Sequence, residues 1–199
     1  GIYHFDLSCK AAIITGGSKG LGLAMAAGLA SAGANVMLVS RDGAVGAESA
    51  LELEKAYGIK AISFSADVSS KEQTEAMANA AMEAFGRIDI LINSAGINIR
   101  GAIDELSEED FKKVMDVNVT GTWLCNRAVT PFMKKAGKGS IINMASTLGL
   151  VGLANRTPYA SSKGAIVQMT RALALELAPF NITDNGLWAG PFLTELYLR

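Results

Sequence analysis

The chain has 199 residues, of which half are hydrophobic, and its formal net charge at pH 7 is −1. This length suits one domain with a substantial core, and the balanced charge gives no electrostatic reason to expect a nucleic acid or an anionic membrane as a partner. No apolar run approaches the roughly 18 residues that a membrane span requires. The N-terminus lacks the basic-then-apolar order of a signal peptide, so we expect a cytoplasmic protein.

Residues that commonly hold metals or act as general bases are scarce. Cys9 and Cys125 lie far apart in apolar surroundings, which predicts two buried free thiols. The single histidine, His4, lies close to the terminus, which argues against a histidine-based metal site and against a Ser-His-Asp triad. Any general acid or base must therefore be another type of residue, and we expect no metal.

Short apolar runs alternate with longer amphipathic ones along the chain. The apolar runs predict strands at 11–15, 35–39, 61–65, 88–92, 140–144 and 182–188. The segments between them predict helices at about 20–31, 45–57, 70–85, 107–133 and 158–177. This alternation indicates an α/β fold with a doubly wound parallel sheet in a three-layer α/β/α arrangement. We expect residues 1–199 to form a single domain.

A glycine-rich turn follows the first predicted strand. Its glycines let the backbone turn tightly and approach a pyrophosphate, and the helix that follows offers unpaired N–H groups at its start. The spacing G-x-x-x-G-x-G is not that of a Walker loop. Such a turn can also serve packing alone, but its place between a strand and a helix favours a dinucleotide site. The predicted phosphate-binding residues are Gly16, Ser18, Lys19, Gly20, Leu21 and Gly22.

The end of the second predicted strand bears on the choice of cofactor. Dinucleotide sites for NAD usually carry an acid there, which binds the ribose 2′-hydroxyl. Here the run is Ser40-Arg41-Asp42, and an arginine can pair with a 2′-phosphate through two hydrogen bonds. Lys19 adds a second positive charge. We therefore predict NADP(H) as the preferred cofactor, with NAD(H) as the alternative if Arg41 is a solvated arginine and Asp42 binds the hydroxyl.

Tyr159 and Lys163 are four residues apart, so they share one face of a helix. An ammonium group beside a phenol favours the phenolate and brings the pKa of the tyrosine towards neutrality. Ser146, thirteen residues upstream, could hold a carbonyl oxygen. The pattern indicates the reduction of ketones or the oxidation of alcohols, whereas Tyr159 and Lys163 alone would more often be an ordinary pair on a helix surface.

Together these motifs resemble the short-chain dehydrogenase/reductase family, over nearly the whole chain, and in particular its 3-oxoacyl-carrier-protein reductases and gluconate 5-dehydrogenases. The resemblance rests on Thr15-Gly16-x-x-x-Gly20-x-Gly22, Asp67-Val68, Asn93-Ser94-Ala95-Gly96, Asn118, Ser146, Tyr159-x-x-x-Lys163 and Gly190-Pro191-Phe192-Leu193-Thr194. It implies a Rossmann-type NAD(P)-binding domain with an integrated substrate site, a small carbonyl or alcohol substrate, and a homo-oligomer that is a dimer or a tetramer.

The resemblance also implies a role for each residue. Tyr159 would be the general acid or base, Lys163 would lower the pKa of the tyrosine and bind the nicotinamide ribose, and Ser146 would polarise the carbonyl. Asn118 would hold the long helix open around a water that relays protons. The further residues expected at the cofactor are Asp67, Val68, Asn93, Ala95, Gly96, Pro191 and Thr194.

The chain departs from the family pattern near its end. Asp184 replaces an apolar residue in a predicted buried strand, where a carboxylate is costly unless paired. Trp188 and Ala189 stand where a small residue and a proline are usual. Family members also continue beyond the position of Arg199, so we expect a C-terminally truncated chain whose last strand is missing, with segment 182–188 at the sheet edge.

Two functions remain open. The favoured one is an NADP(H)-dependent oxidoreductase that interconverts a ketone and a secondary alcohol by hydride transfer, with a 3-oxoacyl or sugar-acid type of substrate. Arg100 and Arg156 could receive a carboxylate, although they could equally be surface arginines. The alternative is a catalytically impaired nucleotide-binding module of the same fold, which Asp184 and the missing C-terminal segment would explain.

Overall fold

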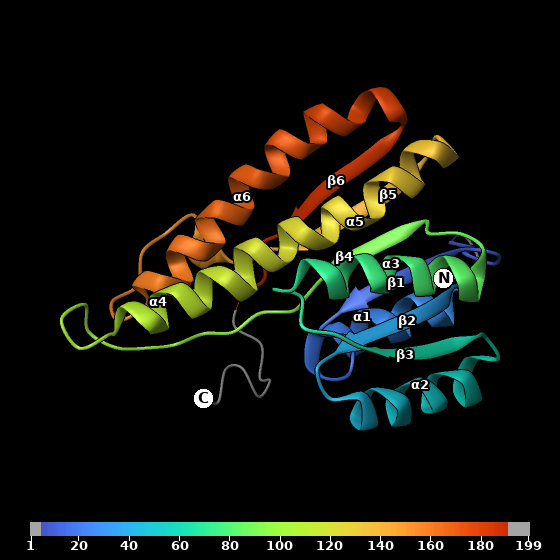
Figure 1. Cartoon of the computed structure of the whole chain (residues 1–199), viewed down its shortest axis with the longest axis horizontal. Coiled ribbons are helices and arrows are strands. Elements are labelled where there is room, and N and C mark those ends of the chain that lie inside the picture. Colours follow the sequence, from blue (N-terminus) through green and yellow to red (C-terminus); the bar gives the residue numbers. More distant parts are fainter. Residues whose placement is uncertain (1–4, 191–199) are drawn as a thin grey trace.

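The computed structural model describes residues 5–190 and contains a six-stranded parallel sheet (Figure 1). The strands pair in the order β3-β2-β1-β4-β5-β6. This order reverses direction between β1 and β4, which is the switch point where sheets of this type bind ligands. The prediction of a doubly wound parallel sheet is confirmed. The strands are β1 (Ala11–Thr15), β2 (Asn35–Ser40), β3 (Ala61–Ser65), β4 (Ile90–Asn93), β5 (Gly139–Met144) and β6 (Ile182–Leu187).

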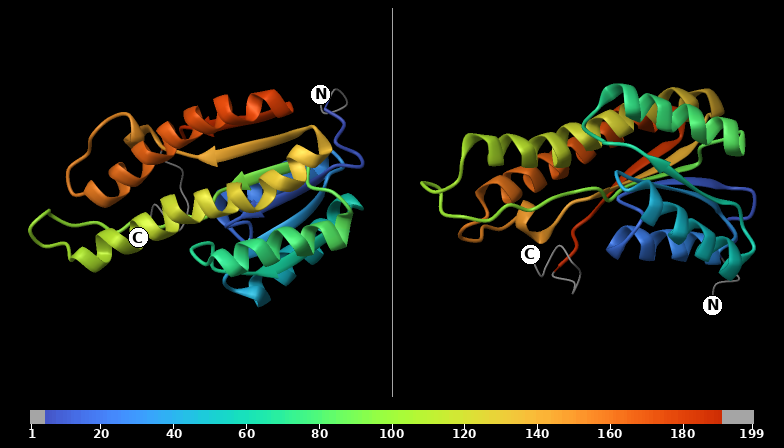
Figure 2. Two further views of the ribbon diagram at one scale, coloured as in Figure 1. Left: turned by 45° about the horizontal axis from the view of Figure 1, so that its top comes forward. Right: turned by 60° about the horizontal axis from the view of Figure 1, so that its bottom comes forward.

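Helices cover both faces of the sheet, with α3 and α5 on one side and α1 and α2 on the other (Figure 2). The helix α6 packs along β6. The α-helices are α1 (Gly20–Ser31), α2 (Gly43–Tyr57), α3 (Lys71–Phe85), α4 (Glu108–Met115), α5 (Gly121–Ala136) and α6 (Thr157–Leu177). Three short turns complete the fold: the π-helical η2 (Asp116–Thr120) and the 3-10 turns η3 (Thr147–Gly149) and η4 (Ala178–Phe180).

The central strands are buried on both faces, which explains why they read as continuous apolar runs. Successive side chains of a strand point to opposite faces. In β1, Ile13 therefore packs on the side of α3 and α5 with Leu91 of β4. Ala12 and Ile14 pack on the side of α1 and α2. The two layers of the core thus meet across β1, beside the switch point.

Local signals set most helix ends. The carboxylate of Asp42 accepts the backbone N–H groups of residues 44 and 45, at 3.1 and 3.2 Å, and so caps α2. Ser107 accepts the backbone N–H of Asp110 at 3.0 Å and caps α4, as the capping pattern predicts. Gly58 ends α2 with a φ of 66°, a left-handed conformation that glycine adopts without strain.

Two predicted boundaries were wrong. The helix expected over 107–133 consists of α4, the π turn η2 and α5, and it continues to Ala136. The strand expected from Ile88 starts at Ile90. Just before it, the backbone N–H of Asp89 donates to the Ala11 carbonyl oxygen, and its carbonyl oxygen accepts from the Ser140 N–H, each at 2.9 Å. The buried Asp89 carboxylate also accepts the backbone N–H of Ala11 at 3.0 Å and pairs with the side chain of Arg87 at 2.6 Å.

The two cysteines differ from each other in exposure. Cys9 is exposed, so the prediction of a buried thiol holds for Cys125 alone; both are free. Within residues 5–190, no three acidic, histidine or cysteine side chains gather in a way that could hold a metal ion. In the same range, no helix has the length and apolar character needed to cross a membrane.

Asp184 lies on β6, at the edge of the described sheet, opposite Ile141 of β5. Its side chain is buried, and its Oδ1 accepts a hydrogen bond from Asn143 Nδ2 at 2.9 Å. Its Oδ2 has no hydrogen-bond partner among residues 5–190. Burial raises the pKa of this carboxyl to about 7. The carboxylate is therefore half-paired, and its ionised form is costly in the folded state.

This shift predicts that Asp184 makes stability depend on pH. The unfolded chain releases this proton near pH 4, whereas the folded protein keeps it until about pH 7. The free energy of unfolding therefore falls as pH rises from 4 to 7 and stays lowered above that. We expect Asp184→Asn to remove this loss. The melting temperature of the variant minus that of the parent should therefore be larger at pH 8 than at pH 4.5, by about 2–4 °C or more.

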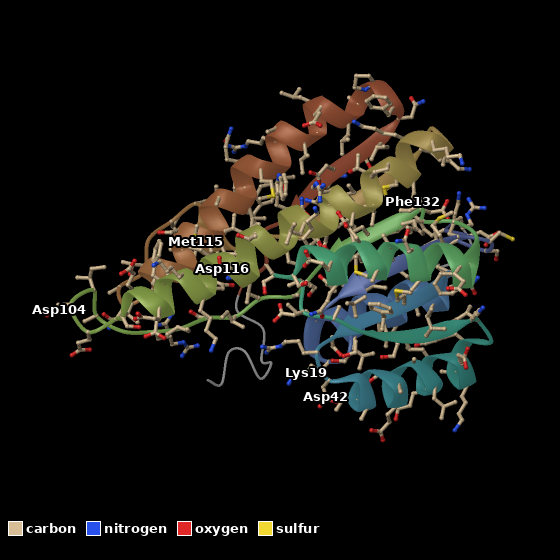
Figure 3. The ribbon with its side chains drawn as sticks, in the orientation of Figure 1. Lys19, Asp42, Asp104, Met115, Asp116 and Phe132 are labelled. Atoms are coloured by element: carbon tan, nitrogen blue, oxygen red, sulfur yellow. The ribbon has the colours of Figure 1, made fainter. Side chains whose placement is uncertain are left out.

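Thermal unfolding at the two pH values measures this gain. Asp104→Asn is the control, because Asp104 is an exposed acid on the loop before α4 (Figure 3). The prediction is wrong if the difference between Asp184→Asn and the parent is the same at both pH values.

Candidate active site

The residues predicted to act together gather at the carboxyl ends of the parallel strands. The turn after β1, the loops after β2 and β3, the segment after β4 and the loop after β5 all open at this rim. Figure 3 labels Lys19 and Asp42, which immediately precede α1 and α2 at this rim. Parallel pairing therefore unites segments that are far apart in the sequence.

The glycine turn after β1 is held against the segment after β4. Gly16 has a φ of 64°, and a Cβ at this position would lie 2.9 Å from backbone atoms of Ala95. A Cβ at Gly22 would overlap the carbonyl oxygen of Gly16. The helix α1 then starts without a side-chain cap and without an acid in its first turn. Its first N–H groups stay available to an anion, so these residues fit the pyrophosphate of a dinucleotide.

The loops after β2 and β3 form the expected adenosine end of the site. Ser40 donates its hydroxyl proton to the carbonyl oxygen of Asp42 at 2.8 Å, and the Asp42 carboxylate caps α2. The Asp67 carboxylate accepts both the backbone N–H and the hydroxyl of Ser69, at 2.9 and 2.6 Å. These bonds lower the pKa of Asp67, and the nearby charge of Arg41 adds to the effect. Both acids are thus engaged within the protein, whereas Arg41 is exposed.

A cavity of about 430 Å³ adjoins these loops. It lies between the ends of β2 and β3 and the helix α4. Its lining residues are Arg41, Asp67, Ser69, Glu109, Lys112, Lys113, Asp116 and Val117. Val68, which the resemblance also places at the adenine, is buried and lies between Asp67 and Ser69 in the sequence.

The segment after β4 lines the centre of the rim. The backbone N–H groups of Ser94 and Ala95 both donate to Thr15 Oγ1 at 3.2 Å, so the threonine at the end of β1 fixes this segment. A Cβ on Gly96 would lie 3.2 Å from Asn118 Oδ1 and 3.9 Å from Lys163 Nζ. Gly96 thus leaves space directly in front of two predicted catalytic side chains.

Asn118 lies in the π turn η2 and is buried. Its Oδ1 accepts the backbone N–H of Ile97 at 2.8 Å, and its Nδ2 donates to the Ile97 carbonyl oxygen at 2.9 Å. The same Nδ2 donates to Ser162 Oγ at 3.0 Å. The amide therefore ties the opened helix to both the segment after β4 and the helix α6. π turns often mark functional positions in helices.

Ser146, Tyr159 and Lys163 meet between β5 and α6. Ser146 is buried, and its hydroxyl accepts the backbone N–H of Leu148 at 3.2 Å. Its side chain is near enough to Tyr159 to lower the pKa of the phenol. Lys163 Nζ lies 5.5 Å from the centre of the Tyr159 ring and donates to the carbonyl oxygen of Met144 at 2.6 Å. A phenol, a serine hydroxyl and a cation therefore share one buried corner of the rim.

Burial dominates the proton affinities in this corner. It raises the pKa of Tyr159, and the hydrogen bond from Ser146 offsets the rise in part. It also lowers the pKa of Lys163 to about 8. The expectation that Lys163 would bring the pKa of Tyr159 downwards is not met in this structure, because desolvation outweighs the other influences on the phenol.

Two predicted residues are outside the described part of the chain, and some contacts were not predicted. Pro191 and Thr194 lie outside the described residues. The contacts of Thr15 Oγ1 with the segment after β4, and of the Met144 carbonyl oxygen with Lys163, could not be predicted, since they depend on the tertiary structure. Ser162, which precedes Lys163 directly, could have been proposed from its place in the Tyr-Ala-Ser-Ser-Lys run.

A parallel sheet with a glycine turn at its switch point and a tyrosine, a lysine and a serine beside it defines an oxidoreductase that uses a nicotinamide dinucleotide. The sequence profile of the short chain dehydrogenases matches residues 10–198. The chain belongs to the short chain dehydrogenase family, as the sequence motifs predict.

Relatives of known annotation agree with this assignment. Glucose 1-dehydrogenase 2 of Bacillus subtilis (strain 168) is 38% identical over 96% of this chain and 74% of its own length. 5-Keto-D-gluconate 5-reductase of Escherichia coli (strain K12) is 36% identical over 96% and 75%. The 3-oxoacyl-[acyl-carrier-protein] reductase of Synechocystis sp. is 32% identical over 96% and 77%.

Solved structures show the same arrangement. A putative short-chain alcohol dehydrogenase from Sinorhizobium meliloti 1021 superposes with a TM-score of 0.92 at 35% identity, over 96% of this chain and 75% of its own. A xylitol dehydrogenase bound to NAD⁺ superposes with a TM-score of 0.89 at 33% identity, over 92% and 70%. The chain is thus an NAD(P)-dependent oxidoreductase of the class that interconverts ketones and alcohols.

Proposed function

We propose that this protein reduces a ketone to a secondary alcohol with NADPH, and catalyses the reverse reaction, with Tyr159 as the general acid or base. The observation that supports this most is that Lys163 Nζ lies 5.5 Å from the centre of the Tyr159 ring, at the same corner of the rim as the buried Ser146. The bound nicotinamide supplies or accepts the hydride. The protein has to place the carbonyl, polarise it and move one proton.

Each side chain has a distinct part in the proposed reaction. Ser146 donates a hydrogen bond to the carbonyl oxygen and orients it. Tyr159 has a raised pKa, so at neutral pH its hydroxyl is protonated and able to donate the proton that the new alkoxide needs. Lys163 has a pKa of about 8 and remains largely charged at neutral pH, which stabilises the phenolate left behind. Asn118 keeps the helix open beside this corner.

Tyr159→Phe tests the role of the phenol. The change removes one hydroxyl and leaves the ring, so we expect turnover with NADPH to fall by a factor of about 10²–10⁴, the usual contribution of general acid–base catalysis. NADPH binding, measured by fluorescence titration, should stay within about threefold of the parent. Tyr57→Phe is the matched control, because Tyr57 is exposed at the end of α2. Comparable turnover in Tyr159→Phe and the parent would exclude this mechanism.

The preference for NADP(H) is supported by the loops after β2 and β3. Asp42 uses its carboxylate to cap α2, and Asp67 uses its own on Ser69. Each acid is held in place through its Oδ1 by these bonds, whereas Arg41 is exposed beside the same cavity. A 2′-phosphate would meet this arginine. The alternative, NAD(H), has the NAD⁺-bound xylitol dehydrogenase as its support.

Arg41→Ala tests this preference. Loss of hydrogen bonds to a charged phosphate costs about 1.5–3 kcal/mol, so we expect the Kd for NADPH to rise about 10- to 100-fold. The Kd for NADH should change less than about threefold. Arg171→Ala, an exposed arginine on α6, controls for the loss of a positive charge. Equal effects of Arg41→Ala on both cofactors would contradict the assignment.

The substrate proposed for this site carries a carboxylate or a 3-oxoacyl group. Two arginines lie together near the catalytic corner, because the backbone N–H of Gly101 donates to the Asn155 carbonyl oxygen at 3.4 Å and so joins the loops that carry Arg100 and Arg156. Arg156 Nη1 donates to the same carbonyl oxygen at 3.0 Å. Burial, and then the charge of Arg100, lower the pKa of Arg156. An anion placed here would relieve the repulsion between the two guanidinium groups.

A pair of matched ketones tests the substrate class. Acetoacetate and methyl acetoacetate carry the same 3-oxo group, but only the first is an anion. We expect Arg156→Gln to lower kcat/KM for acetoacetate about tenfold and to leave the ester nearly unaffected, with Arg171→Gln as the control. A loss of the same size for both ketones would show that Arg156 does not read the charge of the substrate.

A further inference from the structure

A chain of buried polar side chains runs beneath the rim of the sheet. Asn143 of β5 donates its Nδ2 to Asp184 Oδ1 at 2.9 Å and to Thr170 Oγ1 at 3.1 Å. Its Oδ1 accepts from Asn93 Nδ2 at 2.9 Å and from Asn126 Nδ2 at 3.4 Å. Asn93 Nδ2 also donates to Asn126 Oδ1 at 2.7 Å. Strands β4, β5 and β6 and helices α5 and α6 are thus linked through one amide.

The neighbours of Asn143 permit only one orientation of this amide. Thr170 donates its own hydroxyl proton to the Ile166 carbonyl oxygen at 2.9 Å, so it can only accept from Asn143. An ionised Asp184 also only accepts. A flipped amide would set its oxygen against the carboxylate and its NH₂ group against the NH₂ groups of Asn93 and Asn126. With an apolar residue in place of Asp184, one buried N–H would lack a partner, which is costly.

Asn143 is linked to the catalytic corner in two ways, through the residue that follows it in the sequence and through its partner on β4. The following residue, Met144, presents the carbonyl oxygen that accepts from Lys163 Nζ at 2.6 Å. Asn143 is also the register partner of Asn93, the last residue of β4. A change in this amide therefore shifts the ends of β4 and β5 relative to each other, and with them the anchor of Lys163.

We propose that Asp184 is a positioning residue: through the amide of Asn143, its carboxylate fixes the ends of β4 and β5 that hold Lys163 and Ser146 in place. The proposal rests on the oxidoreductase function proposed above. Asp184 touches neither substrate nor cofactor in this account and acts only through Asn143.

The charge state of Asp184 should make this positioning role depend on pH. Burial raises its pKa to about 7, so its protonation changes in the range where the enzyme would be assayed. An ionised acceptor holds a donor more strongly than a neutral one. The fixed orientation of Asn143 should therefore weaken as pH falls below 7.

Few other charges face Asp184. The cavity of about 510 Å³ beside it is lined by Asp184 and by uncharged residues, namely Ala174, Ala178, Asn181, Ile182, Thr183 and Asn185. Neither β5 nor η4 carries a titratable side chain. On α6, Arg171 and Glu176 are exposed, and the buried Lys163 lies seven residues before Thr170, about 10 Å along the helix axis. The raised pKa of Asp184 accordingly comes from burial and not from a neighbouring charge.

The test compares Asp184→Asn, Asp184→Leu and the parent in NADPH-dependent ketone reduction from pH 5.5 to 9. Asp184→Leu removes the acceptor, and we expect kcat to fall about tenfold at every pH while the KM for NADPH stays within about twofold. Asp184→Asn keeps an acceptor oxygen, so kcat at pH 8 should stay within about threefold of the parent and its decline below pH 7 should disappear. Thr183→Val is the control, because Thr183 is exposed on the opposite face of β6. If Asp184→Leu keeps the kcat and the pH profile of the parent, or if its kcat and its KM for NADPH change equally, the proposal is wrong.

A second measurement does not depend on turnover. In ¹⁵N-labelled parent protein, the side-chain amide signals of Asn143 should shift with a midpoint near pH 7, and this shift should be absent in Asp184→Asn. Signals of Asn143 that ignore pH across this range would refute the link between the two side chains. If no ketone is reduced but the amide titrates as expected, the proposed function fails while the coupling between Asp184 and Asn143 stands.

Discussion

A buried ammonium group organises the site of this enzyme. Lys163 Nζ is removed from water, which lowers the pKa of the lysine to about 8, and it donates a hydrogen bond to the Met144 carbonyl oxygen at 2.6 Å. A buried cation without such an acceptor would be expensive. The bond ties the start of α6 to the end of β5. It thereby sets the distance between Tyr159, one helical turn earlier, and Ser146, two residues beyond Met144.

Other buried polar side chains also connect several elements through their hydrogen bonds. With its side-chain amide, Asn118 joins the π turn to the segment after β4 and to α6. The amide of Asn143 likewise joins three strands to one another and to α6. Buried polar networks of this kind specify one arrangement when their members are satisfied. The unpaired Oδ2 of Asp184 marks the place where this chain departs from that rule.

Much of the fold could be predicted because its signals are local. The apolar strands, the cap at Ser107 and the glycine ending α2 depend on few neighbours, and the resemblance placed the site residues at one rim. The resemblance implied an opened helix at Asn118, but the form of the opening, a π turn bonded to Ile97 and Ser162, could not be predicted, since it depends on tertiary contacts. The direction of the Tyr159 pKa was also missed, because spacing along a helix shows the partner but not the degree of burial. The use of Asp42 as a helix cap became visible only in the structure.

The two ends of the proposed cofactor site differ in the kind of contact that forms them. At the centre, backbone meets backbone: Gly16 packs against Ala95 so closely that no side chain fits between them. At the adenosine end, the walls are exposed side chains on loops, such as Arg41 and the lysines of α4. Mutations can therefore change the second region without disturbing the first. If this end binds the adenosine as proposed, natural variation or laboratory evolution can exchange NADP(H) for NAD(H) there without altering Tyr159, Lys163 and Ser146.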